Sequence, residues 1–468
     1  MPSPQPKLGL LFLTAGWFID IGASEGAFAD LPRRLCENAA EMERALADEI
    51  EVVSSGVLAT RAGVAEAMGR FHHEDVEGVV ICPLTWCEDA LILDAVADLR
   101  GLPLLLWCYL PAPSLPARMS MTDLFHGCGP VAALQASGPL KRQGVKFCTA
   151  FGSPQHPEAV HRVIAFGRAA HVARALQGAR IGVLPHRCEI MPGTWVDDDR
   201  LRNEIGAEVE HIPLDEYQAI CAAIPEERVM SFAAGLRAIY RVSPNLTAEG
   251  LRRGARVSLG LAEVAERYQL DAVAIEDVCE ETHRTLGLRP CLFVPALFER
   301  AVVSMEAEVG GAIALLMLRG LTGLPVMYTE IFAADETENT VLAGHAGMMD
   351  IRLTGTEVVL EPDGEYAESE PDSAWMRFQA KPGRVTLLCV FQDVERFRLI
   401  VATGEALGGP PKLLGSPSAH VRLDTPLPEF FTRCMQAGMT QHWALAHAEM
   451  AEELAMLAEM LGVEYVRV

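Results

Sequence analysis

The sequence lacks the short motifs that identify many classes of enzyme. It has no GxxxxGK[ST] phosphate-binding loop, no GxGxxG segment after a strand, no GxSxG nucleophile turn and no HExxH zinc motif. Its twelve cysteines are scattered without a single CxxC pair, which argues against a zinc knuckle. A catalytic site in this chain must therefore be assembled from residues that lie far apart in sequence.

Positive charge is also scarce. The chain carries 39 lysines and arginines against 63 aspartates and glutamates, a net charge of −24. This balance argues against a nucleic-acid partner and against an anionic membrane surface. No stretch reaches about 20 apolar residues without a charge or a turn, so we expect no membrane span.

The N-terminus and the cysteines bear on the compartment. Residues 8–18 are apolar, but no small-x-small cleavage site follows, and Asp20 and Glu25 come soon after. We interpret this segment as a buried first strand rather than a secretory signal. Most cysteines lie in apolar surroundings, which indicates reduced, buried thiols. We therefore expect a cytoplasmic protein.

At 468 residues, the chain is too long for one core. In residues 1–173, short apolar runs alternate with amphipathic helical stretches, which predicts a doubly wound parallel sheet covered on both faces. A second series of the same kind predicts a second α/β domain over residues 174–335. Residues 336–468 change to short runs separated by Gly, Pro and Asp, which predicts an antiparallel, barrel-like domain. Residues 443–461 have helical periodicity and predict a terminal helix.

Two carboxylates stand out within residues 301–331, which we predict to form a strand, a helix and a second strand. Glu306 ends the first apolar run and Glu330 ends the second. In a parallel βαβ unit both would lie at one edge of the sheet, roughly 5 Å apart if the strands are neighbours. Ligands gather at such strand ends. Glu308 is better explained as an acid that favours the start of the helix, and Gly310 with Gly311 as close packing of that helix on a sheet.

Two of the thirteen histidines occupy distinctive positions. His345 lies in a Gly-flanked turn soon after the second acid, and His442 lies where we predict the terminal helix to start. A lone histidine is more often structural than a ligand, and we expect His447 to point away from the face of His442. Two carboxylates with one or two imidazoles would suit Mn²⁺, Mg²⁺ or Co²⁺ with open positions for substrate oxygens.

Several segments of the sequence together resemble a known superfamily. The segments MEAEVGGAIALLMLRGLTGLPVMYTEI, NTVLAGHAG and QHWALAHAEMAEELAMLAEMLGVEYV, with GLRPC and PGTWVDDDRLRNEIGAEVEHI before them, are similar to L-fucose isomerase and L-arabinose isomerase, in particular to divergent isomerase-like members. The resemblance implies two α/β domains followed by an antiparallel domain. It also implies a Mn²⁺-dependent aldose–ketose isomerase that forms a trimer or hexamer.

Carried over by position, the resemblance implies that Glu306 and Glu330 bind the metal and shuttle protons. It implies that His442 is a metal ligand and that His345 is a further one. The substrate would be an open-chain pentose or deoxyhexose, similar to L-arabinose or L-fucose, that reacts through a cis-enediol. The second acid is Glu, as in the arabinose enzymes, whereas MEAEVGGA is closer to the fucose-isomerase-like relatives. The sequence therefore leaves the sugar open, and also which carboxylate acts as base.

Two other functions stay open beside this one. The chain could be another metal-dependent enzyme that acts on a modified sugar or a sugar acid, or a non-catalytic sugar-binding protein, since paired α/β domains also form clefts. Trp195, in a polar turn, and Trp443, beside His442, are candidates to stack on a sugar, although a half-buried tryptophan more often serves packing.

Overall fold

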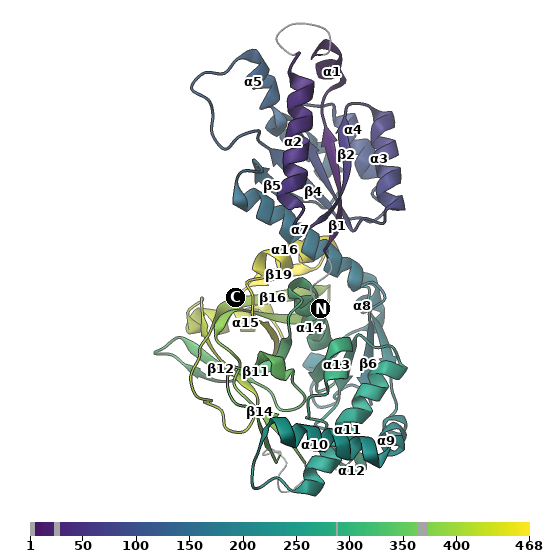
Figure 1. The fold of residues 1–468 in the computed structure, drawn as a ribbon, viewed down its shortest axis with the longest axis vertical. Helices are drawn as coiled ribbons and strands as arrows, with labels where there is room; N and C mark the ends of the chain where they lie inside the picture. The colour runs from purple at the N-terminus through teal and green to yellow at the C-terminus, as the bar shows by residue number, and fades with distance from the viewer. Residues whose placement is uncertain (1–4, 23–28, 287–288, 363–372) are drawn as a thin grey trace. The chain divides into compact units, whose positions relative to one another are not determined.

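The structure is a computed structural model that describes residues 5–22, 29–286, 289–362 and 373–468. The chain forms two compact units. The N-terminal unit comprises residues 2–174 together with 455–462, and the larger unit comprises residues 175–454 together with 463–468. Figure 1 shows the two units, and each is described by itself below.

A five-stranded parallel sheet forms the centre of the N-terminal unit, in the order β2-β1-β3-β4-β5. Its inner strands are continuous apolar runs because helices cover both faces. The strands are β1 (Lys7–Leu13), β2 (Glu51–Leu58), β3 (Gly78–Pro83), β4 (Leu104–Tyr109) and β5 (Cys148–Gly152). The predicted doubly wound domain is confirmed.

The helices of this unit pack on both sides of the sheet. α3, α4 and α6 share one core with alternate residues of β1, β3 and β4. On the other face, Phe166 of α7 packs against Gly78 and Leu8. The helices are α1 (Gly16–Gly22), α2 (Leu31–Leu46), α3 (Arg61–His73), α4 (Asp89–Ala97), α5 (Met121–His126), α6 (Gly129–Arg142) and α7 (Pro157–Ala175).

The larger unit begins with a four-stranded parallel sheet in the order β10-β9-β6-β7. Its strands are β6 (Arg180–Leu184), β7 (Glu208–His211), β9 (Ala272–Ile275) and β10 (Val302–Met305). The helices between them are α8 (Asp198–Glu204), α9 (Leu214–Ala223), α10 (Glu226–Ile239), α11 (Ala248–Arg267), α12 (Glu280–Leu286), α13 (Pro295–Arg300) and α14 (Val309–Thr322). This is the second α/β fold that the sequence predicts.

Six antiparallel strands then close into a barrel, because the first and last strands of the sheet, β15 and β16, also pair with each other. The strands are β11 (Val326–Asp335), β12 (Thr340–Gly344), β15 (Gly383–Gln392), β16 (Phe397–Ala406), β17 (Ser418–Leu423) and β18 (His442–Ala446). A further strand, β19 (Glu464–Arg467), runs parallel to β16. Two helices, α15 (Leu427–Ala437) and α16 (Ala451–Leu461), complete the C-terminal sequence, and most of α16 belongs to the N-terminal unit. The predicted barrel-like domain with a terminal helix is confirmed. β8 (Arg241–Val242), β13 (Val359–Glu361) and β14 (Trp375–Arg377) form a small separate sheet.

Two local predictions were wrong. The strands on either side of α14 do not form a parallel βαβ unit: β10 belongs to the parallel sheet, whereas β11 pairs antiparallel with β12 and β18 in the barrel. His442 starts a barrel strand rather than a helix, and the helix begins only at Ala451. Both errors have one cause. A short, fully buried apolar run has the same pattern in a parallel sheet, a barrel or a buried helix.

α14 connects the two sheets and packs against both. It contacts β9 and β10 on one side and β15 and β18 on the other, and ten of its fourteen residues are buried. Its all-round apolar sequence follows from this position. A Cβ at Gly310 would lie 2.4 Å from the carbonyl oxygen of Val390 in β15, so the predicted close packing is confirmed there.

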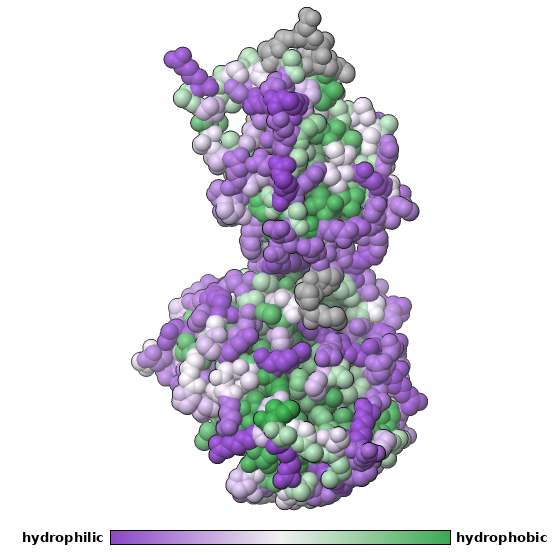
Figure 2. Space-filling model, viewed as in Figure 1, coloured by the Kyte–Doolittle hydropathy of each residue, from purple (hydrophilic) through white to green (hydrophobic). Residues whose placement is uncertain are grey.

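The surface and the cysteines agree with the composition. Each of the twelve cysteines is a free thiol, and most are buried. Hydrophilic side chains are spread over the face shown in Figure 2, in keeping with a net charge of −24. Among the helices described, none is both long enough and apolar enough to cross a bilayer.

Candidate functional site

Glu306 lies directly after β10, at the carboxyl end of the parallel sheet. It and Ala307 both have left-handed backbone angles, with φ of 57° and 49°. Such angles cost of order 1–3 kcal/mol for each residue other than glycine, and they persist only where the surrounding structure imposes them. Here the Glu306 amide donates to Asp277 Oδ1 at 2.9 Å, and the Ala307 amide donates to the Ile275 carbonyl at 2.9 Å. The turn therefore holds the Glu306 carboxylate in a fixed place, 6% exposed.

His345 approaches this carboxylate from the turn after β12. Its Nε2 lies 3.6 Å from Glu306 Oε1, and the side chain is 5% exposed. Its Nδ1 is 2.7 Å from the carbonyl oxygen of Ala346, which can only accept a hydrogen bond. Nδ1 therefore carries a proton, and Nε2 is the nitrogen that faces Glu306. A cation between Nε2 and the carboxylate, whether a proton or a metal ion, would stabilise this pair of atoms.

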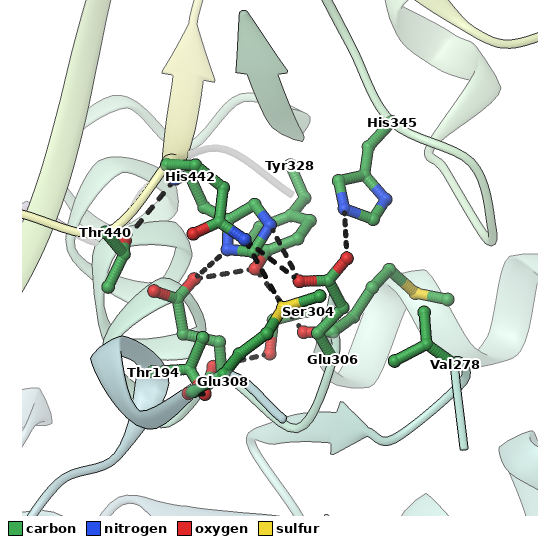
Figure 3. Close-up of polar contacts among 12 residues, drawn as sticks. Thr194, Val278, Ser304, Glu306, Glu308, Tyr328, His345, Thr440 and His442 are labelled. Atoms are coloured by element: carbon green, nitrogen blue, oxygen red, sulfur yellow. Dashed lines mark hydrogen bonds and ion pairs between the residues drawn. The ribbon is translucent and has the colours of Figure 1, made fainter. Parts of the chain in front are cut away.

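His442, the first residue of β18, lies between two carboxylates (Figure 3). Its Nε2 is 3.2 Å from Glu306 Oε2, and its Nδ1 is 3.0 Å from Glu308 Oε2. Burial alone lowers the pKa of His442, but the carboxylates of Glu308 and Glu306 outweigh it and hold that pKa well above its usual range. Burial raises the pKa of Glu306, and the two histidines outweigh it, so the pKa of Glu306 is lowered.

Glu308 was missed as a site residue. It does stand at the N-cap position of α14, as expected for an acid that starts a helix, but its side chain makes no capping hydrogen bond. Instead its Oε2 accepts from the hydroxyl of Tyr328 at 2.6 Å and lies beside His442, with the side chain 1% exposed. The sequence pattern at the start of a helix explains an acid there by itself, so it gave no signal of this second role.

Three further residues around Glu306 were also missed. Asp277, fully buried, accepts from the Glu306 amide and pairs with Arg289 at 3.1 Å. Gln441 donates to Glu306 Oε2 at 3.2 Å. Asp277 had a usable signal, since it follows β9, the parallel neighbour of β10, and therefore lies at the same edge of the sheet. Arg289 belongs to the segment GLRPC, of which residues 287–288 lie outside the described residues.

Glu306, His345 and His442 form the group that could hold a metal ion. One ligand atom from each lies within 4.8 Å of the other two, and all three residues are buried. Ligands around one small divalent ion are at most about 4.2 Å apart, at about 2.1 Å each, so shifts of a few tenths of an ångström would suffice. Two imidazoles and a carboxylate suit a transition-metal ion such as Mn²⁺ or Co²⁺, whereas Mg²⁺ prefers a set with more oxygen ligands. The residues present fit such an ion.

The structure does not place Glu330 in this group of three. Glu330 lies within β11 rather than at its tip, half-buried, opposite His442 of β18 and Gly344 of β12. Residues directly opposite in a ladder project from the same face, with Cβ atoms about 5 Å apart. Glu330 therefore shares the face of the barrel wall that carries His442. No described residue forms a recorded hydrogen bond or ion pair with its carboxylate.

The two candidate tryptophans differ in position. Trp443 is 3% exposed and packs against Phe430 of α15, with ring centroids 5.7 Å apart. Because neighbouring residues of a strand face opposite ways, its ring points away from the face of His442. Trp195 is half-buried, donates to the Cys188 carbonyl at 2.6 Å and carries the Arg187 guanidinium over its ring at 4.0 Å. The turn before Trp195 reaches the site, because Gln441 also contacts Met191.

Comparison with known proteins finds a family that matches the C-terminal part of the chain and relatives that match most of its length. The L-arabinose isomerase C-terminal domain family matches residues 324–464, which contain all six strands of the barrel. This match is consistent with a divergent arabinose isomerase-like member. The chain is 25% identical over 378 residues to a sulfoquinovose isomerase of Priestia aryabhattai, covering 77% of this chain and 79% of that one.

Two other named relatives are similar to this chain over comparable lengths. A sulfoquinovose isomerase of Alkalicoccus urumqiensis is 24% identical and covers 84% of this chain and 86% of its own. An L-arabinose isomerase of Nocardioides sp. is 25% identical and covers 75% and 71%. Every one of these relatives is named as an isomerase, and on this likeness the chain is assigned to the aldose–ketose isomerases.

Proposed function

We propose that this isomerase is metal-dependent and moves a proton between C1 and C2 of an open-chain sugar through a cis-enediol. The observation that carries the proposal is the convergence of Glu306, His345 and His442, from three separate elements, on one buried point. A sugar-binding protein without catalysis has no need for a buried carboxylate between two imidazoles. A bound Mn²⁺, Mg²⁺ or Co²⁺ would polarise the two substrate oxygens and stabilise negative charge on the enediolate.

The residues of the chain divide the remaining work. Glu306, His345 and His442 hold the ion, and Glu330 is the fourth proposed ligand. Glu306 and Glu330 are the proposed pair for proton transfer, one serving carbon and the other the oxygens. Their positions support this, because Glu306 is fixed by its backbone turn whereas Glu330 is half-buried on the same face as His442. Proton transfer of this kind typically contributes roughly 10²–10⁴-fold in rate.

The test is an isomerase assay on L-arabinose, L-fucose and related aldoses with Mn²⁺, and with EDTA. Activity should disappear with EDTA and return with Mn²⁺. Glu306→Gln and Glu330→Gln should each lower kcat by at least about 10²-fold, because each removes a proton-transfer group. Full activity in either variant would show that the residue has no part in the mechanism. Full activity in EDTA would show that the reaction does not need a metal ion.

A second candidate is a sugar with an anionic group, which corresponds to the modified sugar or sugar acid that the sequence left open. Arg187 is exposed and stacks on Trp195, in the segment that reaches the site through Met191 and Gln441. Arginine is well suited to bind a sulfonate or carboxylate in a bidentate way. Two named relatives act on sulfoquinovose, whose name records its sulfo group.

One comparison separates the two substrates. If the substrate is anionic, Arg187→Gln should lower kcat/KM for sulfoquinovose by at least about 10-fold and leave kcat/KM for a neutral aldose unchanged. If the substrate is a pentose or a deoxyhexose, the parent enzyme should prefer L-arabinose or L-fucose, and the variant should behave like the parent. We also propose a cytoplasmic homo-oligomer, a trimer or hexamer, which light scattering at defined protein concentration would test.

A further inference from the structure

Glu308 has no part in the proposed reaction, yet it is one of the most buried carboxylates in the described chain. It is 1% exposed and lies two residues after Glu306. Its Oε2 accepts from the Tyr328 hydroxyl at 2.6 Å and is 3.0 Å from His442 Nδ1. A buried carboxylate is costly unless its neighbours stabilise it, so these two contacts explain why it can remain there.

The place of this carboxylate is set by the packing of α14. A Cβ at Gly311 would lie 2.5 Å from Glu308 Oε2 and 2.5 Å from the ring of Tyr328. Only a residue without a side chain leaves room for the carboxylate at this position. The Tyr328 ring in turn lies 4.8 Å from the ring of His442, so tyrosine, carboxylate and imidazole pack as one group (Figure 3).

We propose that Glu308 is a positioning residue that orients His442 for metal binding. The inference rests on the proposed function, because it assigns a role toward the same ion. Glu308 Oε2 lies 3.0 Å from His442 Nδ1, and this contact keeps Nδ1 on the side away from Glu306, so that Nε2 is directed toward Glu306 and the ion. His345 is oriented in the same manner by the Ala346 carbonyl, which fixes its Nδ1 proton. Each imidazole of the site therefore has an oxygen atom within 3.0 Å of its other nitrogen, the nitrogen that does not face Glu306.

The first experiment measures Mn²⁺ affinity by electron paramagnetic resonance of the free ion, at one pH and without substrate. Removing the outer partner of a metal-binding histidine typically weakens metal binding about 10–100-fold, and Glu308→Gln should fall in that range. Tyr328→Phe keeps the carboxylate and should weaken binding less. Glu453→Gln replaces another buried carboxylate, on α16, and should bind Mn²⁺ like the parent.

A spectroscopic measurement separates orientation from a general loss of structure. Co²⁺ bound to the parent gives an absorption spectrum that depends on its ligands. With Glu308→Gln the spectrum should move toward that of His442→Ala, because His442 is no longer held in place. If Glu308→Gln does not fold, Tyr328→Phe should show the same change in the Co²⁺ spectrum to a smaller extent.

The outcomes distinguish this inference from the proposed function. If Glu306→Gln and His442→Ala lose Mn²⁺ while Glu308→Gln keeps parental affinity and an unchanged Co²⁺ spectrum, the positioning role is wrong and the metal site stands. If Glu306→Gln and His442→Ala bind Mn²⁺ as the parent does, the metal site itself is wrong, and the positioning role is overturned with it.

Discussion

At the scale of single residues, the site depends on which nitrogen or oxygen atom of each side chain its neighbours contact. Glu306 and His345 could be found from the sequence, because an acid after an apolar strand and a histidine in a Gly-flanked turn are unusual. Glu308 could not, because the start of a helix already explains an acid. Tyr328 and Gln441 have ordinary sequence surroundings, and only the three-dimensional contacts distinguish them.

His126 in the N-terminal unit gives a prediction about pH. Its ring is 6% exposed, Nδ1 accepts from Arg34 at 2.9 Å, and Nε2 donates to Asn38 at 2.6 Å. Burial, with Arg34 beside it and only partly offset by Asp123, lowers the pKa of His126 to about 4. An unfolded histidine titrates near 6.5, so as pH falls from about 6.5 to 4 only the unfolded chain gains this proton. Stability should fall over that window by at most about 3 kcal/mol and then level off.

Hydrogen exchange of amides in α2 and α5 at pH 7 and pH 5 measures this loss, and His126→Gln should reduce it. His171 serves as a control, because its contribution to stability depends on pH in the opposite direction. Glu77 raises the pKa of His171, and this outweighs partial burial, so its contribution is present below about pH 6.5 and is lost as pH rises through the raised value. An unchanged pH dependence in His126→Gln would contradict the assignment.

At the scale of elements, α14 determines how the carboxylates meet the histidines. Its N-terminus carries Glu306 and Glu308 from the parallel sheet, and its flanks contact the barrel strands that supply Tyr328 and His442. The sequence correctly predicts a buried helix between two buried strands. It cannot tell which sheet each strand joins, because the hydrogen-bond partners of an apolar strand leave no trace in its own residues.

Gly310→Ala tests this arrangement. The new Cβ would meet the Val390 carbonyl at 2.4 Å, and a backbone atom cannot move without separating α14 from β15. We expect a loss of about 1–3 kcal/mol in the free energy of unfolding, measured by urea denaturation. Gly235→Ala is the control: it also lies inside a helix, with nothing within 4 Å of the new Cβ. It should stabilise the protein by about 0.4–1 kcal/mol, and equal effects of the two variants would contradict close packing at Gly310.

At the scale of the whole molecule, the candidate metal site belongs to the larger unit alone, since Glu306, His345 and His442 lie between residues 175 and 454. An ion that binds only the folded state stabilises it by about 2.7 kcal/mol at 100 times its Kd. Mn²⁺ should therefore slow hydrogen exchange in β10, β12 and β18, and leave β1 to β5 of the N-terminal unit unchanged. His442→Ala should abolish the effect. Slower exchange in β1 to β5 would show a site elsewhere.

Because the site residues come from two sheets, the fold also determines when during folding the site can form. Glu306 and His442 are separated by more than a hundred residues, and the strands between them must close into a barrel before the two side chains meet. Contacts over such distances form slowly, because closing a long loop costs entropy before the contact forms. During synthesis the chain therefore has no complete metal site until β18 has emerged and paired, so the ion should enter a finished unit and should not serve as a template for its folding.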